Sequence, residues 1–314
     1  MQIFSSTLSQ MAFLLMLMAI GYIVTLFNVV DSSAATILSK LENNIFVPAL
    51  IIGTFMDNFT LERIGSAWKF FVGGIIALII AIPLALIGAK LCTKDGYLRK
   101  LFSYGLCFAN FGFMGNAVVL ALFSELFMEY IIFVIPYWIG IYAWAVPKFL
   151  IPSEHHSGRF IDKIRPFLNP MFIAMPIGAI IGLLKIPMPS FFESAVDSLG
   201  ACMSPLAMVL TGITIAKIDL KAAFKNVSIY AVSFLRLIVF PLIAIVILYL
   251  FKVPFEIALC AICSVAMPLG LNTIVVPGAY GLDTTVAAGM ALISHLLSVI
   301  TIPVIFMLFN LLVK

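Results

Sequence analysis

Long apolar segments follow one another along almost the whole chain, and they constrain the fold more than any other feature. A helix needs about 20 apolar residues to cross a bilayer. Of the 314 residues, 63% are hydrophobic and only 10% are charged, whereas soluble domains carry about 25% charged residues. The pattern therefore predicts an all-α membrane protein of ten transmembrane helices. The ten segments are 8–28, 34–56, 68–91, 101–123, 127–149, 169–185, 191–215, 227–251, 255–280 and 285–312.

Two of these segments are interrupted by residues that disfavour a continuous helix. The fourth reads A-N-F-G-F-M-G-N-A over 109–117, and the ninth reads M-P-L-G-L-N-T over 267–273. In lipid, a broken helix is tolerated only where its backbone is buried in protein or lines a wet cavity. A pair of such breaks in the two halves of a chain points to the binding site of a secondary transporter. We therefore predict that the breaks form the functional centre.

The two halves of the chain carry a faint internal repeat. Gly21 and Gly178 are 157 residues apart, and Gly112 and Gly270 are 158 apart, at equivalent places in their segments. A polar connection divides the chain into five segments and five segments. Because five is an odd number, tandem copies must lie upside down relative to each other, which is an inverted-topology repeat. The predicted divisions are a first repeat over 1–150, a cytoplasmic linker over 151–168 and a second, inverted repeat over 169–314.

The distribution of Lys and Arg predicts the orientation, because cytoplasmic loops carry an excess of both. With the N-terminus outside, 12 of the 18 Lys and Arg residues fall on the inner side and 5 on the outer side, and Arg236 lies within a segment. Both termini are therefore expected outside. The short loops, the small size and the lack of a cleavable signal peptide favour a bacterial cytoplasmic membrane. The basic residues lie in loops between spans, so the net charge of +4 does not indicate a nucleic-acid partner.

The two breaks supply the candidate residues for binding a substrate. Asparagine offers donors and an acceptor, so it can bind a carboxylate without a fixed charge. Glycine permits close helix approach, and proline removes an N–H and forces a break. The same residues can instead serve only to cap backbone groups freed at the breaks. The predicted substrate-binding residues are Asn110, Gly112, Gly115, Asn116, Pro268, Gly270, Asn272 and Thr273, with Asn44 contributed by the second segment.

Ionisable residues inside apolar segments are a second class of candidate. Arg236 can balance the charge of an anionic substrate, or it can snorkel or bond to a neighbouring carbonyl. His295 can carry a proton near neutral pH, or it can be a buried, hydrogen-bonded neutral imidazole. Glu42 and Lys40, near the inner end of the second segment, are expected to form an interfacial ion pair.

Motifs for catalysis are absent from the sequence. It contains no G-x-x-x-x-G-K-[ST] loop, no H-E-x-x-H and no G-x-S-x-G. His155 and His156 in the central connection are expected to be a solvated pair. Neither break carries Asp or Glu, so no paired-carboxylate ion site is visible. We therefore expect that this protein is not an enzyme and that it binds neither a metal ion nor a cofactor.

Several strings, in order along almost the whole chain, resemble the auxin efflux carrier family. This family includes the plant PIN auxin exporters and bacterial malate and malonate permeases. The resemblance implies ten helices in two inverted repeats, with helices 1, 2, 6 and 7 as a scaffold. Helices 3–5 and 8–10 would form an elevator-type transport domain with crossing broken helices 4 and 9. The strings are A-I-G-Y, F-V-P-A-L-I-I, N-F-G-F-M-G-N, S-P-L-A-M-V-L-T-G and M-P-L-G-L-N-T-I-V-V-P-G-A-Y-G.

One residue departs from the family pattern. Ala117 stands where the family usually has a proline shortly after the M-G of helix 4. The break on that side would then depend on Gly112, Gly115 and Asn116, whereas helix 9 keeps Pro268.

The resemblance also implies a function. It indicates a secondary transporter of small organic anions, mono- or dicarboxylates such as malate, malonate or auxin-like acids, that works by alternating access. Because neither break carries a carboxylate, the driving force stays open between a proton, sodium and the membrane potential alone. The resemblance further implies a homodimer through the scaffold helices. Two alternatives stay open, a sodium-coupled organic-acid symporter of related fold and a transporter-like ligand sensor. The substrate and the direction of transport are not determined by the sequence.

Overall fold

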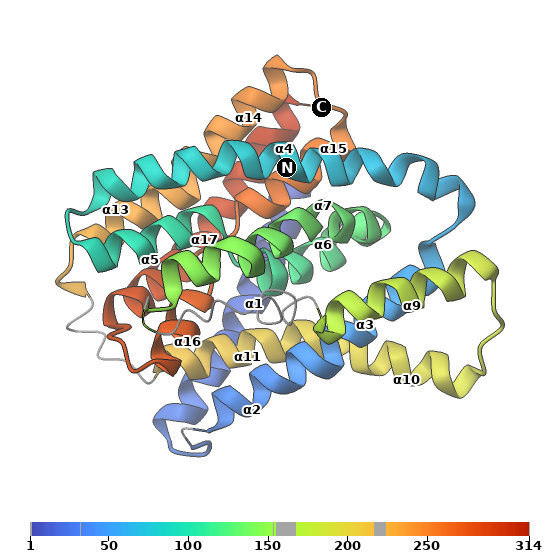
Figure 1. Cartoon of the computed structure of the whole chain (residues 1–314), viewed down its shortest axis with the longest axis horizontal. Helices are drawn as coiled ribbons and strands as arrows, with labels where there is room; N and C mark the ends of the chain where they lie inside the picture. Colours follow the sequence, from blue (N-terminus) through green and yellow to red (C-terminus); the bar gives the residue numbers. More distant parts are fainter. Residues whose placement is uncertain (1, 32, 153, 155–167, 217–223, 314) are drawn as a thin grey trace.

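The computed structural model describes the chain except for residues 1, 32, 153, 155–167, 217–223 and 314 (Figure 1). Most of the predicted linker, with His155 and His156, therefore lies outside the described residues. Throughout the described ranges the regular elements are helices, and the single strand-like feature is an isolated bridge between Ala109 and Leu269. The predicted all-α class is confirmed.

Each apolar segment of the first half is observed as helix. The second segment contains a wide π-helical turn, Glu42–Phe46, and the fifth ends in a π-helical stretch, Ile141–Leu150. The fourth is divided by its break. The helices are α1 (Gln2–Leu26), α2 (Ala34–Leu41), α3 (Val47–Asn58), α4 (Leu61–Cys92), α5 (Gly96–Cys107), the π-helical Phe111–Gly115, α6 (Asn116–Leu122), the 3-10 turn Ser124–Leu126 and α7 (Phe127–Gly140).

The apolar segments of the second half are helical as well. A π-helical turn, Leu235–Val239, joins two helices of the eighth segment, and the ninth is divided by its break. The helices are α9 (Pro170–Leu184), α10 (Ser190–Ala201), α11 (Met203–Ala216), α13 (Ser228–Phe234), α14 (Phe240–Leu250), α15 (Phe255–Val265), α16 (Asn272–Ala279) and α17 (Thr285–Leu312).

Seven helical stretches in the described chain are long and apolar enough to cross a membrane. Three further apolar helices are shorter, and two of these, Phe111–Leu122 and Phe255–Val265, are parts of the broken segments. The shortening is a consequence of the breaks, because each break leaves two half-helices in place of one long helix. The chain is thus a multi-pass helical membrane protein.

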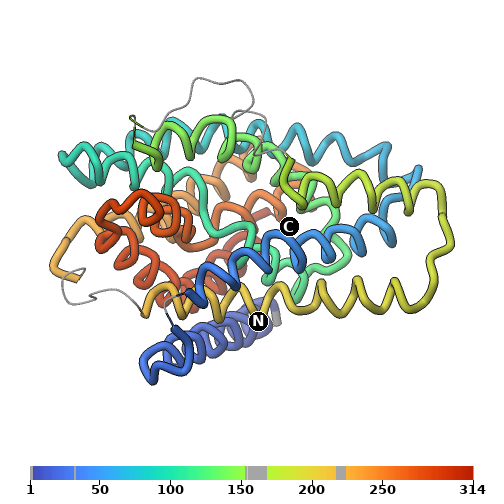
Figure 2. The backbone as a smooth tube through the Cα atoms, turned by 60° about the horizontal axis from the view of Figure 1, so that its bottom comes forward, coloured from blue at the N-terminus to red at the C-terminus, as the bar shows by residue number. Residues whose placement is uncertain are grey.

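Several helices pack against partners that are distant in sequence. α1 packs against α11, and α3 packs against α9, with α10 beside it (Figures 1 and 2). α4 packs on α5 and α7, and α17 packs on α1. The π-helical turn Phe111–Gly115, which follows the first break, contacts α11 and α15 of the second half.

Glycines allow two of these pairs to approach closely. A Cβ atom on Gly21 of α1 would lie 2.1 Å from the carbonyl oxygen of Val209 in α11. A Cβ on Gly178 of α9 would lie 2.7 Å from the carbonyl oxygen of Ile52 in α3. Small residues permit such contact between membrane helices. The two glycines that the repeat relates therefore have the same packing role.

Glu42 and Lys40 do not form the predicted ion pair. Glu42 is only 1% exposed, and neither of its carboxylate oxygens has a hydrogen-bond partner in the part of the chain that the structure describes. Lys40 is exposed on the other side of the helix. Residues two apart on a helix do not face each other, which is why the prediction was wrong.

Candidate functional site

The two breaks are in direct contact. α5 ends at Cys107 and helix resumes at Phe111, whereas α15 ends at Val265 and α16 begins at Asn272. Between them, the backbone N–H of Asn110 donates to the carbonyl oxygen of Pro268 at 2.8 Å. Proline has no N–H to return this bond. The two interruptions that the sequence predicts therefore meet each other in space.

The side chain of Asn110 is held by His295 of α17. The Asn110 Nδ2 atom lies 3.1 Å from His295 Nε2, and His295 Nδ1 lies 2.7 Å from the carbonyl oxygen of Ala291. A carbonyl can only accept, so Nδ1 carries the proton and Nε2 accepts from the Asn110 amide. The structure thus brings two of the predicted residues together, and both contacts suit a neutral imidazole.

Asn272 begins α16 and is held by a residue that the sequence analysis missed. Its Nδ2 donates to the hydroxyl oxygen of Tyr104 at 2.8 Å. Tyr104 lies in α5, 168 residues earlier, and is 1% exposed. No local pattern around Tyr104 distinguishes it from a packing residue, so only the fold could show this contact.

A cavity of about 910 Å³ lies beside the breaks. Five of the predicted residues line it, one from α2–α3 and the others from the two breaks. The π-helical stretch after α7 and the start of α9 contribute further walls. The predicted residues on this cavity are Asn44, Asn110, Gly112, Gly270 and Asn272.

Aromatic rings form one wall of this cavity. Trp138 of α7 lies edge-on to Phe111 with ring centroids 5.1 Å apart and stacks on Tyr142 at 6.0 Å. A Cβ on Gly112 would lie 2.6 Å from the Trp138 ring, so glycine is needed for the break to approach this wall. Trp138 and Tyr142 cannot be singled out from the sequence, because aromatic residues are common in apolar helices.

Lys40 is the only charged residue among the described residues that line the cavity. It belongs to α2, and its carbonyl oxygen accepts a hydrogen bond from Asn44 Nδ2 at 2.7 Å. Since Lys40 has no carboxylate bonded to it in the described chain, its ammonium group is free to attract an anion.

Four predicted residues do not line the cavity. Thr273 is fully buried and its hydroxyl donates to the Gly270 carbonyl at 2.9 Å. A Cβ on Gly115 would lie 2.3 Å from the Tyr130 hydroxyl, so this glycine makes room for α7. The remaining two are Pro268, which accepts the bond from Asn110, and Asn116, which is 3% exposed.

The alanine that replaces the family proline is not at the break. Ala117 lies inside α6 and is 1% exposed. The helix is interrupted upstream, between Cys107 and Phe111, and a π-helical turn follows to Gly115. The break therefore forms without a proline at position 117.

Arg236 is away from the cavity. It is 2% exposed and donates three hydrogen bonds, from Nε to the Met267 carbonyl (3.1 Å), from one terminal nitrogen to Leu106 (2.8 Å) and from the other to Ser264 (3.1 Å). Of the two roles considered from the sequence, the bond to carbonyls is the one present. Arg236 is not among the residues that line the cavity, and charge balancing of a substrate by Arg236 stays a prediction.

Among the described residues, no cluster of three or more His, Cys, Asp or Glu side chains could hold a metal ion.

The fold and the site together define a class of protein. A helical membrane protein whose two broken helices meet beside a central cavity has the organisation of a membrane carrier. The profile of the family described as membrane transport protein matches residues 6–159 and again residues 154–306. The chain therefore belongs to this family, that of the auxin efflux carriers, whose members are membrane transporters. No curated protein matches the chain.

Proposed function

We propose that this protein is a carrier of small organic anions, mono- or dicarboxylates such as malate, malonate or auxin-like acids, that works by alternating access. The observation that supports this most is the cavity itself, because it reaches both helix breaks and Lys40 is the one charged group on its described wall. A cationic residue in a water-accessible cleft raises the local concentration of anions.

The deep end of the cavity offers neutral groups that suit an anion. Asn272 is the first residue of α16, and a helix N-terminus carries partial positive charge. Such half-helix N-termini receive anionic substrates in other transporter folds. The amides of Asn110 and Asn272 would supply the hydrogen-bond donors, with His295 and Tyr104 holding them in place.

The walls favour one kind of acid. With one lysine among its described lining residues and a wall formed by Phe111, Trp138 and Tyr142, the cavity suits one carboxylate attached to an apolar or aromatic body. A second carboxylate, as in malate, would face aromatic rings and lose solvation without a partner. Within the proposed class, monocarboxylates are therefore expected to bind more tightly.

The proposed movement is that of an elevator. A scaffold of α1, α2–α3, α9 and α10–α11 would hold a transport domain of α4–α7 and α13–α17. The matching roles of Gly21 and Gly178 support the inverted repeats over 1–150 and 169–314, as do the bond between Asn110 and Pro268 and the double match of the family profile. Asn110 and Pro268 are 158 residues apart, the same offset as Gly112 and Gly270, so the repeat relates them to each other. Repeat-related residues that touch must lie near the pseudo-two-fold axis.

The cavity mouth suggests an orientation. Lys40 lies on the side that carries most of the Lys and Arg residues, which is the cytoplasmic side by the positive-inside rule. The cavity would then be open to the cytoplasm, with both termini outside. We further propose a homodimer through the scaffold helices in a bacterial cytoplasmic membrane.

The first test is electrical. We expect proteoliposomes on a solid-supported membrane to give a transport current with at least one of indole-acetate, lactate, malate, malonate and succinate. Asn272→Ala should lower that current at least about tenfold, because the variant loses a donor that is desolvated in the site. Asn310→Ala is the matched control, since the Asn310 side-chain oxygen has no hydrogen-bond partner among the described residues.

Other outcomes would favour the alternatives. A current that requires sodium would support a sodium-coupled organic-acid symporter. Binding of an anion without any flux would support a ligand sensor. If neither binding nor current is found with any of the acids, the proposed substrate class is wrong.

The charge at the cavity mouth gives a second prediction. Lys40→Gln should raise the KM for the transported anion several-fold at low salt, with a smaller effect at high salt, because long-range attraction is screened. Lys94→Gln is the control, since Lys94 is exposed but does not line the cavity. An equal effect of both substitutions would mean that Lys40 acts only through the net charge.

A further inference from the structure

Arg236 lies where two broken helices end. Leu106 is the penultimate residue of α5, Ser264 is the penultimate residue of α15, and Met267 follows two residues after α15. The carbonyl oxygens of all three accept hydrogen bonds from the Arg236 guanidinium group. One side chain of the α13–α14 segment therefore satisfies the C-terminal ends of both half-helices at once.

The charges of these groups match. A helix C-terminus carries roughly −0.5 of an elementary charge from its unpaired carbonyl groups. Two such ends together amount to roughly one negative charge, and one guanidinium group carries one positive charge. All three hydrogen bonds that Arg236 makes in the described chain go to backbone carbonyls, and none goes to a carboxylate.

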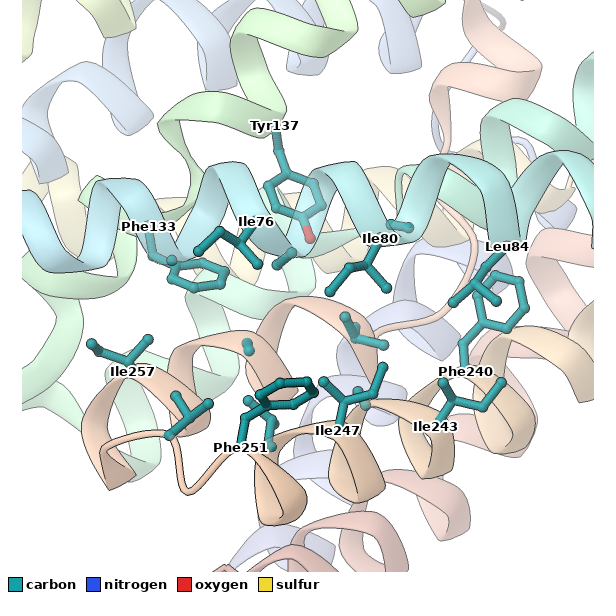
Figure 3. Close-up of a pocket in the computed structure, with 18 of the residues that line it drawn as sticks. Ile76, Ile80, Leu84, Phe133, Tyr137, Phe240, Ile243, Ile247, Phe251 and Ile257 are labelled. Atoms are coloured by element: carbon teal, nitrogen blue, oxygen red, sulfur yellow. The ribbon is translucent and has the colours of Figure 1, made fainter.

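The surroundings of Arg236 are closed to the substrate cavity. It lines a separate pocket of about 510 Å³ between α4, α14 and α15, together with Cys107 and Tyr137. Figure 3 shows that the labelled residues of this pocket are apolar except for the Tyr137 hydroxyl. No described residue lines both cavities, so an anion in the substrate cavity would not touch the guanidinium group.

In secondary transporters, a coupling cation is coordinated by backbone carbonyl groups of unwound helix segments and by the C-terminal ends of half-helices. We propose that Arg236 is a covalently attached substitute for that cation. It holds the crossing of the two breaks permanently in the state that a bound ion would produce. This inference rests on the proposed carrier function and deepens it, because it makes transport independent of sodium.

The first test measures stability and does not need a substrate. In detergent, Arg236→Ala should lower the Tm by about 10 °C, since three buried carbonyls lose their donor. Low millimolar guanidinium chloride should restore part of this loss relative to choline chloride at equal ionic strength. The Tm of the wild type should be the same in guanidinium chloride and in choline chloride. Arg99→Ala is the matched control, because Arg99 also donates to a carbonyl, that of Lys94, but is exposed.

A second pair of variants keeps the proposal testable if the alanine variant does not fold. Arg236→Lys retains the charge, and Arg236→Gln retains donors without it. We expect the lysine variant to keep a higher Tm and a larger transport current than the glutamine variant. If the two are equal, hydrogen bonding without charge is sufficient and the proposal is wrong.

The transport readout separates this inference from the proposed function. We expect wild-type anion current to be the same in sodium and in choline buffers. If the wild type transports none of the acids, the substrate proposal fails while the guanidinium rescue of the Tm can still be observed. If the acids are transported but sodium is required, or guanidinium does not rescue Arg236→Ala, the role given to Arg236 is overturned.

Discussion

Replacing Gly212 with alanine is expected to destabilise the folded protein strongly. A Cβ on Gly212 in α11 would lie 1.9 Å from the carbonyl oxygen of Met18 and 2.7 Å from the backbone nitrogen of Tyr22, both in α1. Backbone atoms cannot rotate away as a side chain can, so the two helices would have to separate. We expect a loss of about 3 kcal/mol, at the upper end of the usual cost of overpacking.

A loss of stability in Gly212→Ala would be a clear test of the packing of α1 on α11. Alanine is a better helix former than glycine by about 1 kcal/mol, so any loss must come from the helix contact. Gly65 of α4 is the control, because an added Cβ there would meet no described atom within 4 Å. Gly65→Ala should therefore be neutral or stabilising, whereas Gly212→Ala should lower both the yield of monodisperse protein in size-exclusion chromatography and its Tm. Equal behaviour of the two variants would contradict the packing of α1 on α11.

The second large effect is expected at His295. In His295→Leu, the Asn110 amide loses the acceptor that orients it, and a buried polar group without a partner costs about 1–3 kcal/mol. If that energy is lost from substrate binding or the transport step, the anion current should fall roughly 10- to 100-fold. We do not expect another group to replace the lost contact with His295. Asn110 lies where the two breaks meet, and its backbone is also bonded to Pro268.

His295→Gln distinguishes a positioning role from a proton carrier. Glutamine can place an oxygen near the position of His295 Nε2 and accept from Asn110, so we expect its current to stay within a few-fold of the wild type. If Nε2 were protonated, the Asn110 amide would have to turn its oxygen toward the ring, which would change the group presented to the cavity. A wild-type current that varies between about pH 5 and pH 8, combined with a pH-independent current in His295→Gln, would support coupling through His295. A glutamine variant that is as inactive as the leucine variant would contradict positioning by a hydrogen bond alone.

Much of the fold could be predicted because its causes are local. The length of each apolar run determines that it is a helix that can cross a bilayer, and every predicted segment is helical in the structure. The breaks are also local, since Pro268 lacks an N–H and the Gly and Asn residues around 109–117 disfavour a continuous helix. The predicted breaks accordingly coincide with the ends of α5 and α15.

The partners of the site residues could not be predicted in the same way. In a soluble helix, the polar face shows which side meets solvent. In a membrane helix both lipid and protein interior are apolar, so hydrophobic periodicity does not show which side meets another helix. This is why the sequence does not show that Glu42 is buried without a partner, or that Tyr104 and Trp138 contact residues of the two broken segments.

The sequence by itself determined the class of protein, the positions of its helices and the two places where helices break, because these depend on the chemistry of neighbouring residues. Only the tertiary structure decided that Asn110 meets His295, that Lys40 faces the cavity and that Arg236 binds the ends of α5 and α15. These contacts join residues up to 185 positions apart. They depend on which helix faces pack together, and the packing is decided by close backbone approach at glycines such as Gly21 and Gly212 together with the burial of polar groups that lipid cannot solvate.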